Sequence, residues 1–150
     1  MNNMKEEIKK EWIKRLRSGA IKQGYGKLGT TAGYRIPLGV LCDIAVDHGV
    51  IDKPGRDGPD MGGGSTLVYG DDVGPFKALP IEVCEWADIH PYGKIEGDPH
   101  NRSIKEANNR LSFSETADLI ESSVLAGYSP EDLPIEYTKR DTLAALMGVG

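Results

Sequence analysis

Cysteine and histidine are scarce in this sequence, and long apolar runs are absent. Its 150 residues include two cysteines, Cys42 and Cys84, and three histidines. Each cysteine lies in an apolar run and no C-x-x-C motif occurs, so we expect two buried free thiols in a reducing cytoplasm. No secretory apolar segment follows Met1, and no run reaches the roughly 18 apolar residues of a membrane span. We therefore expect no membrane partner.

The signatures of metal binding and nucleophilic catalysis are also missing. His48, His90 and His100 are far apart, and none has a second ligand at the spacing of a zinc site. The sequence contains no G-x-S-x-G elbow, and nothing in it supports a cysteine–histidine pair. We accordingly predict no catalytic residue, no metal and no cofactor.

Positive charge is in deficit, with 18 lysines and arginines against 23 acidic residues and a net charge of −5. A fold with this balance lacks the electrostatic footprint of a protein that binds duplex nucleic acid. Basic residues do cluster near the N-terminus, at Lys5, Lys9, Lys10, Lys14, Arg15, Arg17 and Lys22. This cluster is either a solvated helix face balanced by neighbouring glutamates or a small patch for a phosphate-bearing ligand or an acidic partner.

Apolar periodicity predicts one domain, residues 1–150, with a mainly helical fold. Ile8, Trp12 and Leu16 repeat every four residues and predict a helix over residues 4–18. Asn3 is its expected N-cap and Gly19 its expected end. Further helices are expected over residues 38–48, 79–89, 103–110 and 113–125, and a last short one within residues 142–147.

Two of these helices carry more specific signals. The segment 38–48 is apolar on most sides, which predicts a helix at the centre of the fold. Ser112 and Glu115 form a capping box at the start of the helix over residues 113–125. The expected core residues are Trp12, Leu41, Ile44, Trp86 and Ile120.

Glycine and proline punctuate the segments between the helices. Residues 20–37 are expected to form two short strands or a glycine-rich turn, and residues 66–69 a short strand. Residues 52–65 and 90–101 are expected to be long loops. The predicted fold class is therefore α+β, mainly helical, with four to five helices around one core, short strands or a small hairpin, and long loops rich in glycine and proline.

Four motifs follow one another along the chain. They are Trp12, Leu16-Arg17-Ser18-Gly19, Gln23-Gly24 and Leu28; Gly39-Val40-Leu41-Cys42-Asp43; Leu79-Pro80, Val83 and Trp86-Ala87; and Ser112-Phe113, Glu115, Ala117-Asp118 and Ile120-Glu121. With these motifs the sequence resembles a family of small, functionally uncharacterised proteins encoded mainly by tailed bacteriophages and prophages. The resemblance implies a phage accessory protein that works in the cytoplasm of the infected bacterial host cell.

The resemblance covers a family-like core, residues 1–127, and leaves residues 128–150 as a C-terminal extension. The chain departs from the family at one place. Members of the family usually carry two adjacent cysteines where this chain has Ile36-Pro37. That departure puts in doubt any metal or redox role that would combine such cysteines with Cys42.

Polar and aromatic residues gather around the junction of the first two predicted helices. The candidate ligand-binding residues are Arg17, Gln23, Tyr25, Tyr34, Arg35, Asp43 and Trp86. An arginine can fork onto phosphate or carboxylate, and an amide both donates and accepts. Tyrosines offer stacking faces, and Trp86 is expected to close the pocket. The alternative is structural, with Arg17 and Asp43 paired to lock the two helices together.

Two glycine-rich stretches could wrap backbone N–H groups around a phosphate. They are Gly62-Gly63-Gly64-Ser65-Thr66 and Gly24-Tyr25-Gly26-Lys27. Neither has the strand and the lysine spacing of a P-loop, so flexible loops are favoured.

These observations support three functional hypotheses. The leading one is a phage anti-defence protein that binds and sequesters a small nucleotide-type host immune signal without catalysis. The second is a protein–protein inhibitor that covers a host enzyme or defence complex with its acidic surface. The third is a small hydrolase or transferase with Asp43 or Glu82 as a base. Each leaves open whether the protein forms a homo-oligomer.

Overall fold

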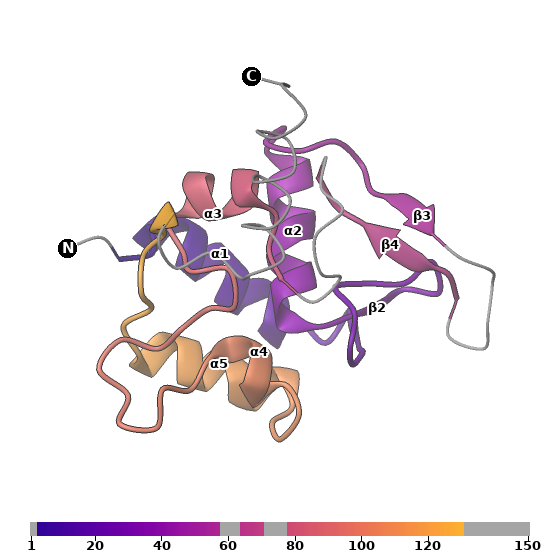
Figure 1. The fold of residues 1–150 in the computed structure, drawn as a ribbon. Helices are drawn as coiled ribbons and strands as arrows, with labels where there is room; N and C mark the ends of the chain where they lie inside the picture. The colour runs from indigo at the N-terminus through magenta and orange to yellow at the C-terminus, as the bar shows by residue number, and fades with distance from the viewer. Residues whose placement is uncertain (1–2, 58–63, 71–77, 131–150) are drawn as a thin grey trace.

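The computed structural model of the protein describes residues 3–57, 64–70 and 78–130. In this part of the chain five helices surround one apolar core, with two small two-stranded sheets beside it (Figure 1). The predicted α+β, mainly helical fold is confirmed. The helices are α1 (Glu6–Arg17), α2 (Pro37–Asp47), α3 (Ile81–Ala87), α4 (Ile104–Ala107) and α5 (Phe113–Ser122). The strands are β1 (Lys22–Gln23), β2 (Tyr34–Arg35), β3 (Gly55–Asp57) and β4 (Thr66–Val68).

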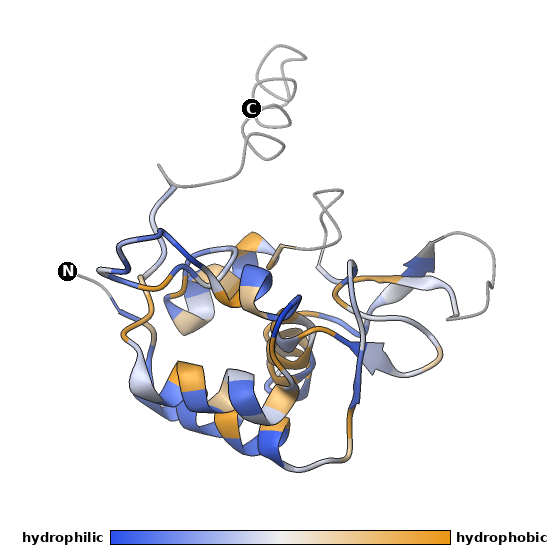
Figure 2. Cartoon of the chain, turned by 90° about the horizontal axis from the view of Figure 1, so that it is seen from below, coloured by the Kyte–Doolittle hydropathy of each residue, from blue (hydrophilic) through white to orange (hydrophobic). Residues whose placement is uncertain are grey.

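Helix α2 lies at the centre of the fold, as its apolar composition predicts (Figure 1). Its buried residues include Leu41 and Ile44, which have no exposed surface. Seen nearly end-on in Figure 2, the helix is mostly apolar. Gly39 lets α2 pack directly on the backbone of Leu28, because a Cβ atom at position 39 would overlap the Leu28 carbonyl oxygen.

Helix α1 packs against both α2 and α5 through the apolar stripe that the sequence predicts. Trp12 is fully buried, and its Nε1 donates to the Pro37 carbonyl oxygen at 2.8 Å. The predicted start of the helix is wrong, since Lys5 and not Asn3 is the N-cap residue. Asn3 instead forms an antiparallel bridge with Ala126, which brings the two ends of the described chain together.

Helix α5 begins at the predicted capping box. The Ser112 side chain accepts from the Glu115 backbone N–H, and the Glu115 side chain accepts from the Ser112 N–H. The helix ends at Ser122 and not at residue 125, because Ser123 adopts an extended backbone. Hydrophobic periodicity continues past that point, but the hydrogen-bonded helix does not.

The two sheets are joined through one short segment. Strand β1 pairs in parallel with β2, and β3 pairs in antiparallel with β4. Gly29 forms an antiparallel bridge with Arg35 of β2, and the next residue, Thr30, forms one with Thr66 of β4. The chain between β1 and β2 therefore lies between the two sheets and connects them.

Two other expectations concern the loops and the chain end. The predicted loop over residues 52–65 contains a strand, because Gly55–Asp57 pairs with β4. The expected helix within residues 142–147 lies outside the described residues. Within the described segments, no helix combines the length and apolar character that crossing a bilayer requires.

Candidate functional site

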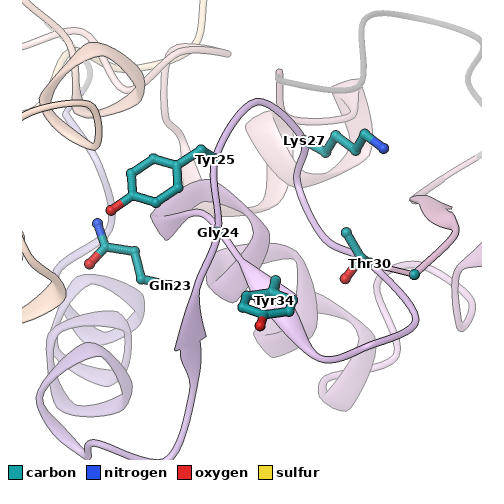
Figure 3. Close-up of a pocket in the computed structure, with 7 residues that line it drawn as sticks. Gln23, Gly24, Tyr25, Lys27, Thr30 and Tyr34 are labelled. Atoms are coloured by element: carbon teal, nitrogen blue, oxygen red, sulfur yellow. The ribbon is translucent and has the colours of Figure 1, made fainter. Parts of the chain in front are cut away.

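A cavity of about 390 Å³ opens beside the connection between β1 and β2 (Figure 3). It is lined by Gln23, Gly24, Tyr25, Lys27, Thr30, Tyr34 and Gly64. We call it the Tyr34 cavity. Three of the seven sequence candidates, Gln23, Tyr25 and Tyr34, line this cavity, and two more, Arg35 and Asp43, contact each other beside it. The other two candidates, Arg17 and Trp86, are not part of its lining.

Two exposed tyrosines supply the aromatic surface of the cavity. Tyr25 is 64% exposed and Tyr34 is 39% exposed, which is unusual for large apolar rings in this fold. Figure 3 places Tyr25 and Gln23 on one side of the loop backbone and Tyr34 on the other. Lys22, the cross-strand partner of Tyr34, holds its ammonium group 5.4 Å from the centre of the Tyr34 ring. This cation–π contact stabilises the position of the ring at the cavity.

The Gln23 side chain is held in place by residues from a distant part of the sequence. Its Nε2 donates to Oδ1 of Asn108 and to the Leu111 carbonyl oxygen, both at 2.8 Å. Asn108, which is buried, returns a hydrogen bond from Nδ2 to the Gly24 carbonyl oxygen at 2.9 Å. Both amide donors of Gln23 are thus used within the fold, and its carbonyl oxygen, which accepts no hydrogen bond from the described residues, is the atom left for a ligand.

A half-buried polar network supports the wall of the cavity from behind. Arg35 donates from Nε to Oδ2 of Asp43 at 2.9 Å, and from Nη1 to the carbonyl oxygens of Thr30 and Tyr34 at 3.0 and 2.9 Å. Tyr69 donates to Oδ1 of Asp43 at 2.7 Å. Burial, together with the Asp43 charge, raises the pKa of the Tyr69 phenol well above its ordinary value, so it remains a donor. The network fixes the backbone of two lining residues.

Lys27 and Thr30 complete the polar part of the lining. Lys27 carries the positive charge of the described lining, and its side chain is exposed. The Thr30 hydroxyl oxygen is buried and finds no hydrogen-bond partner among the described residues. The Thr30 side chain thus lines the cavity, while its hydroxyl oxygen does not face the open space.

Arg17 does not form the predicted pair with Asp43. Its Nη2 donates to Oδ1 of Asp118 at 2.7 Å and to Oε1 of Glu121 at 3.0 Å. These hydrogen bonds raise the pKa of the Arg17 guanidinium and lower that of the Glu121 carboxyl. The structural role foreseen for Arg17 exists, but it joins α1 to α5 on the surface and not α1 to α2.

Trp86 lies at a different cavity, of about 580 Å³, which we call the Trp86 cavity. It is lined by Lys5, Glu6, Glu7, Ile8, Glu11, His48 and Trp86. The Trp86 and His48 rings lie 5.6 Å apart, and His48 Nε2 contacts Oε1 of Glu11 at 3.0 Å. Trp86 was also expected in the core, but it is only half-buried against it. His48 caps the C-terminus of α2.

The described residues contain no group of three or more histidine, cysteine or acidic side chains that could hold a metal ion. Cys42 and Cys84 are buried free thiols, as predicted, and burial raises the pKa of both.

Glu82 lines a third, polar cavity of about 450 Å³ beside the Gly49–Lys53 turn. The two carboxylates considered as bases therefore lie at different sites, Asp43 beside the Tyr34 cavity and Glu82 at the third cavity.

Several residues of this site were not among the sequence candidates, including the lining residues Gly24, Lys27, Thr30 and Gly64 and the supporting residues Tyr69 and Asn108. Lys27 had a visible signal, because it follows two glycines in the stretch that was compared with a phosphate-binding loop. Asn108 had no such signal, because the residue that it hydrogen-bonds, Gln23, is 85 positions away in the sequence. Tyr69 likewise reaches Asp43 only through the pairing of β4 with the Gly29–Thr30 segment.

A comparison with protein families places this chain in one of them. A family model described as "Domain of unknown function (DUF8296)" matches residues 4–124. The chain belongs to this family. The DUF8296 match runs from just before α1 to just past the end of α5, and it includes every described residue that lines the Tyr34 cavity. No curated protein and no solved structure matches the chain.

Proposed function

We propose that this protein is a bacteriophage accessory protein that captures a nucleotide-type small molecule in the Tyr34 cavity and holds it chemically unchanged. The observation that carries the proposal is the lining itself. It combines two exposed aromatic rings with an ammonium and an amide carbonyl. Aromatic rings can stack on a base, and an ammonium can bind a phosphate.

The size and construction of the cavity agree with a ligand of this class. Its volume of about 390 Å³ falls within the range of roughly 300–1,000 Å³ typical of small-molecule sites. Its wall is also prepared in advance, because Arg35 and Asp43 hold the backbone of Thr30 and Tyr34. A wall that is already ordered loses less entropy on binding, which favours affinity.

Sequestration fits the chemical groups present better than turnover does. Asp43 would be the nearest base, but its two oxygens accept from Arg35 and Tyr69. Glu82 lines another cavity. A protein that removes a signal from solution needs affinity alone, and the lining supplies the contacts for that. The motif resemblance supports a phage origin, so the proposed ligand is a host immune signal in the cytoplasm of the infected cell.

Thermal unfolding against a panel of mononucleotides, dinucleotides and cyclic nucleotides tests the proposal. A ligand present at about 100 times its Kd should stabilise the protein by about 2.7 kcal/mol. Tyr34→Leu should abolish that shift, and Lys10→Met, a change of an exposed α1 residue away from the cavity, should preserve it. The ligand released by denaturing the complex should have its original mass. A panel in which no compound raises the melting temperature, or a ligand recovered as a product, would overturn the proposal.

A further inference from the structure

We infer that the Tyr34 cavity selects nucleotides that carry a single phosphate group over those with two or three. This inference rests on the proposed function and deepens it by naming the ligand's charge. It applies equally to a phosphomonoester and to a cyclic phosphodiester, because both present one phosphate to the protein.

The first argument is the charge of the lining. Among the described residues that line the cavity, Lys27 is the one cation, and the remaining six are uncharged. One ammonium on a flexible stem can pair with one phosphate group as a point charge. A second or third phosphate would find no further cation in the lining, within a protein of net charge −5.

The second argument is that the neighbouring cations are already engaged. Arg35 binds Asp43 through Nε and two backbone carbonyl oxygens through Nη1. Turning it toward a ligand would leave the half-buried Asp43 without its ion-pair partner, which is costly. Lys22 holds its ammonium over the Tyr34 ring and is not part of the lining. Arg35 is therefore unavailable to an additional phosphate, and Lys22 would have to give up its contact with the Tyr34 ring to bind one.

The third argument concerns the type of contact that remains for the rest of the ligand. Gln23 offers a carbonyl oxygen, and Tyr25 and Tyr34 offer rings. These groups suit a base and a sugar, and none attracts an anion strongly. The additional phosphates of a larger nucleotide would therefore lose hydration against neutral groups without gaining a cation, in a protein of negative net charge, and this penalty disfavours their binding.

Calorimetric titration at fixed ionic strength tests the inference. The ligands are AMP, cyclic AMP, ADP and ATP, and the four corresponding guanine nucleotides. For the base that binds, we expect AMP or its cyclic form to bind at least about fivefold more tightly than ADP, and ATP to bind more weakly still. Fivefold corresponds to one unit charge interacting across about 4 Å of water-like medium. Comparing the affinities of the monoester and the cyclic diester shows which of these two kinds of phosphate the cavity prefers.

The variant Lys27→Met tests whether the Lys27 ammonium binds the phosphate, with Lys10→Met as the control. Lys27→Met should weaken binding of the monophosphate about fivefold and remove most of its salt dependence, and Lys10→Met should change neither. Binding of ADP or ATP as tight as that of AMP would overturn the inference while leaving the proposed function intact, as would an unaltered affinity of Lys27→Met. A panel in which no nucleotide binds would overturn both.

Discussion

Arg35 of β2 and Asp43 of α2 form an ion pair of 2.9 Å between Nε and Oδ2, with side chains 17% and 30% exposed. The pair joins the central helix α2 to the sheet formed by β1 and β2. Because the same guanidinium also holds the carbonyl oxygens of Thr30 and Tyr34, the pair sets the position of the cavity wall. Tyr69 occupies the other carboxylate oxygen and brings β4 into the same network.

Asp43→Ala should therefore destabilise the fold by about 2 kcal/mol. Removing one partner leaves a partly buried guanidinium uncompensated, and the usual cost of about 3–5 kcal/mol for fully buried pairs is reduced here by solvent screening. Tyr69→Phe removes a single hydrogen bond and should cost about 1 kcal/mol. Urea unfolding measures both values. An Asp43→Ala variant as stable as the wild type would show that the network is unimportant.

Gly39→Ala should destabilise the protein by about 3 kcal/mol, although alanine is the better helix former. The new Cβ would overlap the carbonyl oxygen of Leu28, so α2 and the backbone of residue 28 would have to separate. Gly55→Ala is the matched control, since a Cβ there meets no atom within 4 Å. Chemical denaturation of the two variants gives the comparison, and equal stabilities would contradict the direct helix-to-backbone packing.

Arg17→Gln should have a small effect that depends on salt. The Arg17 side chain and its partners Asp118 and Glu121 are exposed, so their attraction is screened by ions. We expect a slightly lower melting temperature at low ionic strength and no difference from the wild type near 1 M salt. A large loss of stability that persists at high salt would mean that α1 and α5 depend on this contact more than on their apolar faces.

Asp98 should make the Asp98–Arg102 turn sensitive to acid. Its carboxylate accepts from Arg102 and from the backbone N–H of His100, which together hold its pKa well below the usual range. A lowered pKa in the folded state means that the stabilisation is fully present above the unfolded pKa of about 3.9 and is lost as pH falls below it. The stability difference between wild type and Asp98→Asn should thus be largest near neutral pH and shrink below about pH 4. Unfolding curves between pH 2 and 7 measure it, and a difference independent of pH would refute the assignment.

Local signals in the sequence predicted the helices well because their causes are local. The apolar stripe of α1, the Ser112–Glu115 capping box and the positive φ of Gly19 after α1 all depend on residues within a few positions of one another. The ends of helices were less predictable. Residue 125 belongs to a hydrophobic pattern that continues beyond α5, but its backbone is in a bridge to Ile95, a contact from a distant part of the chain.

The candidate site was only partly predictable for the same reason. Gln23, Tyr25 and Tyr34 could be proposed because polar and aromatic residues gather in the glycine-rich connector between the first two predicted helices. Which acid each arginine binds could not be inferred, because several carboxylates were available to both. Arg17 contacts Asp118 across 101 positions of the chain, and Arg35 contacts Asp43 across eight.

By itself the sequence determined that this chain builds a helical α+β core around an apolar central helix, because hydrophobic burial depends mainly on the order of apolar and polar residues. The tertiary structure alone decided where the open surface of that fold lies. Where α1 packs on α5, the Arg17 guanidinium binds Asp118 and is not available at the cavity. The bridges of Gly29 and Thr30 join the two sheets, and Tyr34 and Lys27 line one cavity there. Charges and rings acquire their partners through such long-range contacts, whose geometry is set only when the whole chain has packed.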